Sequence, residues 1–232
     1  TGKPAPELKF FNMCWMEIGG KQVHALRHGM AGQPGYELMG PWAERDAVHA
    51  ALVAAGANHG MKLVGGRTYS SNTIESGWIP SPLPGIYTGD LLKPYREWLS
   101  TNHYEAKASV GGSWVPDSVE GYYLTPWDLG YGPFVKFDHD FIGREALEAM
   151  ATQPQRKKVT LALDDDSVTE AIYGQFGKGE LRPKYMEFPS AVYSMHPFDR
   201  VEVNGKLVGL STWISYTANE GKMLTLAMLD EE

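Results

Sequence analysis

The sequence predicts an α+β protein, because short strand-like and helix-like segments alternate along its 232 residues. Residues 7–39 show strand alternation around a glycine-rich turn, residues 41–59 show helical spacing, and the last third consists of strand-like runs between turn signals. With 43% hydrophobic residues, the chain has enough apolar material for one large domain or two smaller ones. This composition argues against disordered and fibrous classes.

The first part of the chain follows the order strand, turn, strand, helix. Val23, Ala25 and Arg27 alternate with His24, Leu26 and His28, as in a strand, and residues 29–35 crowd glycines and a proline into a short loop. Pro41 then opens a helical pattern that continues to about His59, where Gly60 stops it. A glycine-rich turn between two strands, followed by one helix, is therefore expected.

The middle of the chain is expected to be loop-rich. Residues 64–89 are low in charge and rich in Gly, Ser, Thr and Pro, which predicts a loop that lines a site. Short helices are expected at 91–99 and 141–150, with loop and strand over 101–124. The polar stretch 153–158 contains a proline and predicts a boundary between domains 1–152 and 153–232.

The second predicted domain is all strand. Strand-like runs are separated by turn signals, including Asn204-Gly205, which is typical of a tight hairpin. We expect a small antiparallel β-barrel or sandwich. The runs cover residues 159–163, 191–195, 201–203, 207–213 and 223–228.

Charge and cysteine content favour small-molecule chemistry inside the cell. A net charge of −7 provides no field for a polyphosphate backbone, so a nucleic-acid partner is not expected. The single cysteine, Cys14, excludes an internal disulfide and suits a reducing compartment. No apolar run approaches the roughly 20 residues of a membrane span, and no secretory signal is visible. A soluble cytoplasmic protein is the simplest interpretation.

Familiar catalytic motifs are missing from the sequence. It has no phosphate-binding glycine loop, no H-E-x-x-H and no G-x-S-x-G. His24 and His28 share a face merely by strand alternation, and the aspartates at 138–140 and 164–166 suit solvated turns, so no metal site is expected. Aromatic residues that include Trp78 and Tyr87 gather in loop-rich stretches, where they either line a flat-ring pocket or pack in the core.

Five blocks of sequence, in order, resemble the aminomethyltransferase (glycine-cleavage T-protein) family. Residues 27–38 resemble its R-T-G-Y-T-G-E-D-G-F-E-I run, and residues 74–77 are similar to L-E-A-G. Residues 125–137 are similar to T-P-L-E-A-G-L-G-W-A-V-K-F, with 140–147 directly after them, and residues 209–223 look like the closing barrel segment. The resemblance therefore covers nearly the whole chain.

The resemblance implies a tetrahydrofolate-dependent one-carbon transferase, of which this chain is the C-terminal portion. Residues 1–152 would be the C-terminal part of the folate-binding lobe, and 153–232 the barrel. Glu37 occupies the family's pterin-binding position, where a buried carboxylate accepts two hydrogen bonds from the pterin edge. The family's N-terminal part, with a catalytic carboxylate, has no counterpart in these residues, so an N-terminal segment is expected to complete the site.

Departures from the family pattern point to one branch of it. Tyr69 stands where the family has a folate-site Arg, and Pro133 replaces a Trp. Together with residues 77–84, these changes resemble the branch that demethylates aryl methyl ethers such as vanillate and syringate, in the catabolism of lignin-derived aromatics. Alternatives are an aminomethyltransferase, a demethylase of small amine or sulfonium donors, and a folate-binding module without turnover.

The residue types suggest roles in such a reaction. Tyr69, with an ordinary pKa of about 10, matches a phenolic leaving group in acidity and is the candidate acid, with packing as the alternative. Arg67, expected on the same strand-like face, would hold a substrate or folate carboxylate. Trp78 and Tyr87 are candidate walls of the substrate pocket. Tetrahydrofolate would be the methyl acceptor.

Overall fold

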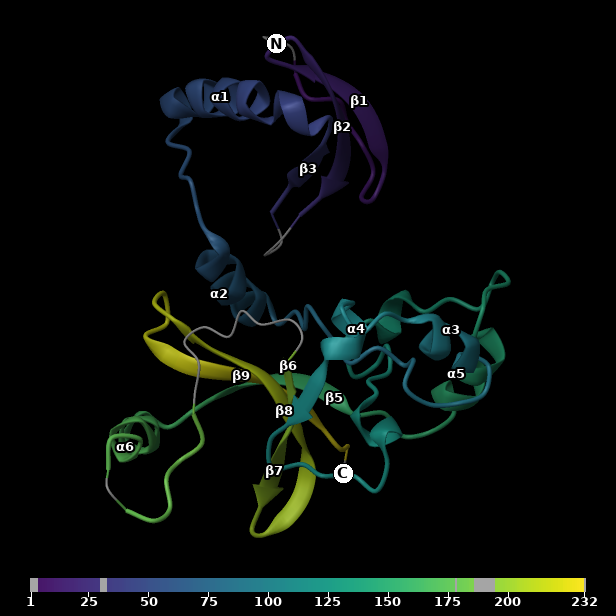
Figure 1. The fold of residues 1–232 in the computed structure, drawn as a ribbon, viewed down its shortest axis with the longest axis vertical. Helices are drawn as coiled ribbons and strands as arrows, with labels where there is room; N and C mark the ends of the chain where they lie inside the picture. Colours follow the sequence, from purple (N-terminus) through teal and green to yellow (C-terminus); the bar gives the residue numbers. More distant parts are fainter. Residues whose placement is uncertain (1–3, 30–32, 178, 186–194, 232) are drawn as a thin grey trace. The chain divides into compact units, whose positions relative to one another are not determined.

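The computed structural model of the chain describes residues 4–29, 33–177, 179–185 and 195–231. The chain forms two compact units, Thr1–Asn72 and Thr73–Glu232. Both contain helices and a β-sheet (Figure 1), so the predicted α+β class is confirmed.

The first unit is a three-stranded antiparallel sheet with one long helix. The strands pair in the order β1-β2-β3, and the two 3₁₀ turns η1 and η2 flank the helix α1. This arrangement confirms the predicted strand pair around the glycine-rich turn and the helical segment over 41–59, which ends at Gly60 in the left-handed conformation. The bounds are β1 (Met13–Ile18), β2 (Lys21–His28), β3 (Gly35–Met39), η1 (Trp42–Glu44), α1 (Arg45–Gly56) and η2 (Ala57–His59).

The turn between β1 and β2 lies against α1. Gly19 has φ +59°, and a Cβ at this position would come within 2.9 Å of the Ala51 Cβ on the helix. Glycine therefore both adopts the left-handed turn and lets the helix approach the sheet closely. Val23 and Ala25 are buried, and strand alternation places His24, Leu26 and His28 on the opposite face of β2.

The expectation of a loop throughout residues 64–89 is wrong at α2 (Gly66–Ser76). Its Ser, Thr and Gly content gives low helix propensity, but the hydroxyls of Ser70 and Ser71 bond back to the carbonyls of Gly66 and Arg67, at 3.4 and 3.2 Å. Fully buried Ile74 on the same helix adds tertiary packing, which overrides propensity. The segment after Gly77 is irregular, as predicted.

The second unit contains a four-stranded antiparallel sheet in the order β5-β9-β8-β7 and a short parallel pair, β4 and β6. Asn204 and Gly205, both at positive φ, form the predicted hairpin turn. Among the described residues these strands make a sheet, and the barrel stays a prediction; expected strand residues 191–194 lie outside the described part. The bounds are β4 (Ser109–Gly111), β5 (Lys157–Ala162), β6 (Met195–Pro197), β7 (Asp199–Val203), β8 (Lys206–Thr217) and β9 (Lys222–Leu229).

The second unit also contains several short helices. The helices predicted near 91–99 and 141–150 are confirmed as α3 and α5, each shorter than expected. The prediction of a solvated turn for the aspartates at 164–166 is wrong, because these residues begin the helix α6. Asp164 caps the helix by accepting a hydrogen bond from the Ser167 N–H at 3.0 Å, and Asp165 and Asp166 lie in its first turn. The bounds are α3 (Lys93–Trp98), α4 (Tyr104–Lys107), η3 (Val119–Tyr122), η4 (Gly132–Phe134), α5 (Arg144–Ala151) and α6 (Asp165–Gly174).

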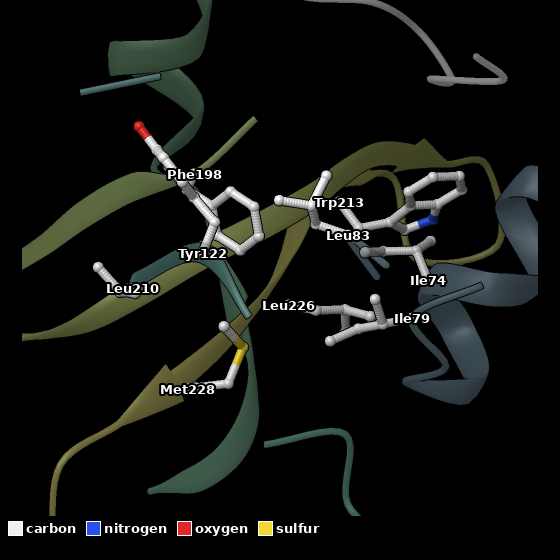
Figure 2. Packing of buried hydrophobic residues seen from close by; sticks show 9 residues of the cluster. All are labelled: Ile74, Ile79, Leu83, Tyr122, Phe198, Leu210, Trp213, Leu226 and Met228. Carbon is white, nitrogen blue, oxygen red and sulfur yellow. The ribbon is translucent and has the colours of Figure 1, made fainter. Parts of the chain in front are cut away.

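The hydrophobic core of the second unit joins residues from before and after the predicted domain boundary. Its buried side chains come from the end of α2, the following loop, η3, the residue between β6 and β7, and the strands β8 and β9 (Figure 2). The boundary at 152/153 therefore falls inside one compact unit of this chain and stays a prediction about domains. The cluster consists of Ile74, Ile79, Leu83, Tyr122, Phe198, Leu210, Trp213, Leu226 and Met228.

Candidate functional site

One face of the β1–β3 sheet is open and carries both aromatic and charged groups. Residues that pair directly across strands project to the same face, and the pairings Trp15–His24–Met39 and Met13–Leu26–Glu37 define it. The exposed fraction is 67% for Trp15 and 43% for each of the two methionines. We call this surface the open face: Met13, Trp15, His24, Leu26, His28, Glu37 and Met39.

Glu37 lies on the open face, on β3. Its side chain is 58% exposed, so the expected buried carboxylate is wrong for the chain as it stands. Its Oε1 lies 2.9 Å from His28 Nδ1, a distance that makes an ion pair when the imidazole is protonated. The rings of Phe10 and Phe11 pack at 5.9 and 5.3 Å from the His28 ring. The carboxylate is thus oriented by a histidine that aromatic neighbours hold in place.

A second pair on the open face forms a flat aromatic platform. The rings of Trp15 and His24 stack at 4.6 Å with an interplanar angle of 17°. Because Trp15 is largely exposed, its ring can stack with a flat heterocycle, while Glu37 on the same face offers two acceptor oxygens. Sequence reasoning missed Trp15, although the alternation along β1 would have placed it on this face.

Arg27 fixes the strand ends from which Glu37 projects. Its Nη1 donates to the carbonyl oxygens of His28 and Gly35, at 2.8 and 3.2 Å, across the glycine-rich turn. These two residues pair at the last position of the β2–β3 ladder. The guanidinium therefore closes the ladder next to the turn, and the turn residues 30–32 lie outside the described part.

Arg67 and Tyr69 are in the first turns of α2, not on a strand. Residues two apart on an α-helix are rotated by about 200° around its axis. The expected common face is therefore wrong: Arg67 is exposed, whereas Tyr69 is half-buried. Their proposed roles have to be assigned to separate faces of the helix.

Trp78 and Tyr87 belong to the second unit, and both are half-buried. The Tyr87 ring packs against the core cluster, and its hydroxyl donates to the carbonyl oxygen of Glu105 at 2.8 Å. Burial raises the pKa of Tyr87 above its usual value of 10. The five predicted residues are therefore distributed over both units, with Glu37, Arg67 and Tyr69 in the first.

Comparisons with known proteins match this chain along its length. Residues 3–81 match the family described as the GCVT N-terminal domain. A syringate O-demethylase of Sphingobium sp. is 64% identical over 229 residues, which are 99% of this chain and 49% of that protein. The chain thus resembles the aminomethyltransferase family along nearly its whole length. The matched domain contains Glu37, Arg67, Tyr69 and Trp78, whereas Tyr87 lies beyond it.

Two further relatives in the family are more distant. A sesamin methylene transferase of Sinomonas sp. is 29% identical over 227 residues, covering 92% of this chain and 50% of that protein. An aminomethyltransferase of Saccharopolyspora erythraea is 29% identical over 167 residues, covering 71% of this chain and 36% of that protein. The chain thus spans about half the length of the first two relatives.

Two sequence blocks that carry the family resemblance are joined by Lys158 on β5. Its Nζ donates to the carbonyl oxygens of Gly77 and Leu129, at 2.5 and 2.9 Å. Burial lowers the pKa of Lys158 from its ordinary value of 10.5. Sequence reasoning missed this lysine because its partners are 81 and 29 residues away, and no local pattern signals such a contact.

A buried ion pair supports the same region. Arg156 binds Asp128 through two parallel bonds, Nε to Oδ1 at 2.8 Å and Nη2 to Oδ2 at 2.9 Å. The Asp128 side chain is 3% exposed and also accepts from the amide and hydroxyl of Thr125. The two carboxylate oxygens together accept four bonds, so we interpret this pair as a structural anchor.

Two general findings limit the kinds of site present. Among the described residues, no three His, Cys, Asp or Glu side chains are placed to hold a metal ion. In the same part of the chain, no helix is long and apolar enough to cross a membrane.

Proposed function

We propose that this chain is part of a tetrahydrofolate-dependent O-demethylase, which moves a methyl group from an aromatic methyl ether such as syringate or vanillate to tetrahydrofolate. The observation that carries the proposal is the 64% identity, over 99% of the chain, to a syringate O-demethylase. Because the chain spans 49% of that relative, the proposal concerns the whole protein, with an N-terminal segment supplying the rest of the site.

In this proposal Glu37 binds the pterin ring. A pterin presents a guanidine-like edge of N–H donors, and the exposed carboxylate of Glu37 supplies two acceptors for it. The stacked Trp15 and His24 on the same face would support the flat ring. These residues fit the folate, which supplies a nitrogen as the methyl acceptor. When the pterin binds, Glu37 would either give up its contact with His28 or bind His28 and the pterin at the same time.

The remaining site residues are assigned to the donor side. Breaking the aryl ether leaves a phenolate oxygen, and the phenol of Tyr69 would donate to it, since the two have similar acidity. The methyl carbon exchanges its bond to oxygen for a bond to the folate nitrogen, and the proton of that nitrogen ends on the released phenol. Arg67 would hold a carboxylate from another face of α2, and Trp78 and Tyr87 would form walls.

Three further features belong to the same proposal. The sheet β5-β9-β8-β7 would be part of a small antiparallel barrel covering 153–232, and residues 1–152 part of the folate-binding lobe. A single cysteine, half-buried and not in a disulfide, supports a cytoplasmic location. Neither nucleic acid nor a membrane is proposed as a partner.

The decisive experiment incubates the full-length protein with tetrahydrofolate and syringate or vanillate. We expect methyl-tetrahydrofolate and the free phenolic product in equal amounts. The 29% identity to an aminomethyltransferase keeps an amine or sulfonium donor as the alternative, and turnover of such a donor alone would contradict the aryl proposal. Folate binding with no methyl transfer from any donor would instead support a non-catalytic module.

Tyr69→Phe tests the acid more narrowly. Loss of the hydroxyl should lower kcat by roughly 100-fold, which is the lower end of the roughly 10²- to 10⁴-fold contribution of a general acid. A rate near that of the wild type would assign Tyr69 to packing and leave the rest of the proposal unaffected.

A further inference from the structure

The carbonyl oxygens around Tyr87 are held by one guanidinium. Arg96 donates from Nη1 to the carbonyl oxygens of Ile86 and Thr88, at 3.0 and 2.9 Å, and from Nη2 to that of Gly89 at 2.7 Å. We call residues 86–89 the Tyr87 segment. Three bonds from one side chain to one short segment specify its backbone conformation, because each carbonyl has to face the same point.

Arg96 is well suited to this task. It projects from α3, which begins with a proline in its first turn, and its side chain is half-buried. Among the described residues, no carboxylate forms an ion pair with it, so its charge is directed at the backbone carbonyls. A guanidinium presents five N–H donors in a rigid plane, whereas a lysine presents a compact ammonium on a flexible stem.

The other side of the Tyr87 segment is held independently. The Tyr87 N–H donates to the hydroxyl oxygen of Tyr123 at 3.1 Å, and the Thr88 hydroxyl lies 3.2 Å from that same oxygen. The Tyr87 hydroxyl donates to the Glu105 carbonyl on α4. The backbone and side chain of Tyr87 are thus fixed by Tyr123, directly after η3, and by Glu105 on α4, although the segment itself has no helix or strand.

We infer that Arg96 is a positioning residue: it orders the Tyr87 segment and thereby fixes the wall that Tyr87 forms in the aryl-donor site. The inference rests on the proposed function for the role of the wall, but the ordering of the segment does not depend on it. A wall that is already ordered spares the ordering cost that a flexible loop would incur when the donor binds.

The first test measures backbone hydrogen exchange in the full-length protein. In Arg96→Ala, peptides covering residues 84–92 should exchange at least tenfold faster, since the three carbonyls lose their common donor. Peptides from β8 and β9 should be unchanged, which shows that the fold is intact. Lys93→Ala on the same helix is the matched control, because its side chain is exposed and, among the described residues, pairs with Glu97 alone, at 3.9 Å. Unchanged exchange in 84–92 would overturn the inference.

The second test separates positioning from catalysis. In Arg96→Ala the KM for the aryl donor should rise about tenfold, with less than a threefold change in kcat and in the KM for tetrahydrofolate. Arg96→Lys keeps the charge but not the planar fork, so it should rescue less than half of the loss. Full rescue by lysine, or an unchanged donor KM, would overturn the positioning role.

The two tests also distinguish this inference from the proposed function. If wild-type protein demethylates no aryl ether but Arg96→Ala still loosens residues 84–92, the function fails and the ordering role stands. If the wild type turns over the aryl donor and the variant neither loosens the segment nor changes the donor KM, the function stands and the inference fails.

Discussion

The two sheets of the molecule differ in how much of their surface is covered. In β9 of the second unit, five of eight residues are buried, whereas β1 of the first unit has none. Among the described residues, the buried hydrophobic side chains of the first unit are Val23 and Ala25, while nine form the core cluster of the second. The second sheet is therefore largely buried along its central strand β9, whereas the first leaves one face exposed among the described residues.

The polar groups of the two units follow the same division. In the second unit several of them pair with one another inside the structure: the Trp213 indole donates to the Thr73 hydroxyl at 2.7 Å, and Asp128 accepts from Arg156. In the first unit Glu37 stays more than half exposed, with acceptor capacity available. Buried polar groups that satisfy each other stabilise a fold, whereas an exposed acceptor beside aromatic rings is available for binding.

The largest expected effect on stability comes from breaking the buried ion pair. Arg156→Ala leaves the Asp128 carboxylate buried without its cation and should lower the free energy of unfolding by about 3 kcal/mol, measured by urea titration. Arg144→Ala is the matched control, since its partners Asp140 and Glu148 are 102% and 44% exposed. That change should cost less than about 1 kcal/mol. Equal losses in the two variants would contradict the distinction.

The next effect concerns the open face. Glu37→Gln keeps the shape of the side chain but replaces one acceptor by a donor, so binding of tetrahydrofolate to the full-length protein should weaken roughly 100-fold, or about 2.7 kcal/mol. Thermal stability should stay within a degree or two, because the side chain is exposed. Glu17→Gln on β1 is the control and should bind folate normally. Unchanged binding in Glu37→Gln would remove Glu37 from the folate site.

A pair of methionines compares the two sheets directly. Met228 on β9 is fully buried, whereas Met39 on β3 is 43% exposed. Met228→Ala should therefore reduce the free energy of unfolding by about 2 kcal/mol more than Met39→Ala, because only the first leaves a cavity in a packed core. Chemical denaturation of both variants measures the difference. If Met39→Ala is equally destabilising, the open face is covered in the full-length protein.

The elements predicted correctly from sequence are those with local signals. Strand alternation around Val23, the turn at Asn204-Gly205 and the helical pattern ending at Gly60 each need only a few neighbouring residues. The cap of α6 also has a local signal, because Asp164 lies three residues before Ser167, the usual spacing between an N-cap side chain and the N–H that it accepts from. The prediction of a solvated turn at this position is nevertheless wrong.

What could not be predicted depends on residues far apart in the chain. The helix α2 contains weak helix formers, and its end is stabilised by Trp213, 140 residues from Thr73. In the site, the strand alternation that places Glu37 and His28 on one face is a local signal, but the contact between them appears only in the folded structure. Lys158 and the buried ion pair of Asp128 and Arg156 stayed invisible, since their partners are fixed only by the folded structure.

The smallest expected effect tests whether the scaffold contains a pH-sensitive group. His196 on β6 is 3% exposed, and its Nδ1 lies 3.1 Å from the Ser81 carbonyl oxygen, so Nδ1 carries the proton of the neutral ring. Among the described residues, its buried Nε2 has no hydrogen-bond partner. Burial lowers the pKa of His196 below its ordinary value of 6.5. As the pH falls through 6.5, the unfolded chain therefore binds a proton that the folded chain does not.

Because of this difference in proton binding, acidification below the unfolded-state pKa of His196 lowers the free energy of unfolding. Above that pKa, His196 has no such effect. Between pH 7.5 and 5.5, the wild type should lose more unfolding free energy than His196→Gln, which has no group to titrate in this range. Parallel stability curves for the wild type and His196→Gln would show that His196 takes up its proton at the same pH in the folded and unfolded protein, against the lowering of its pKa by burial on β6.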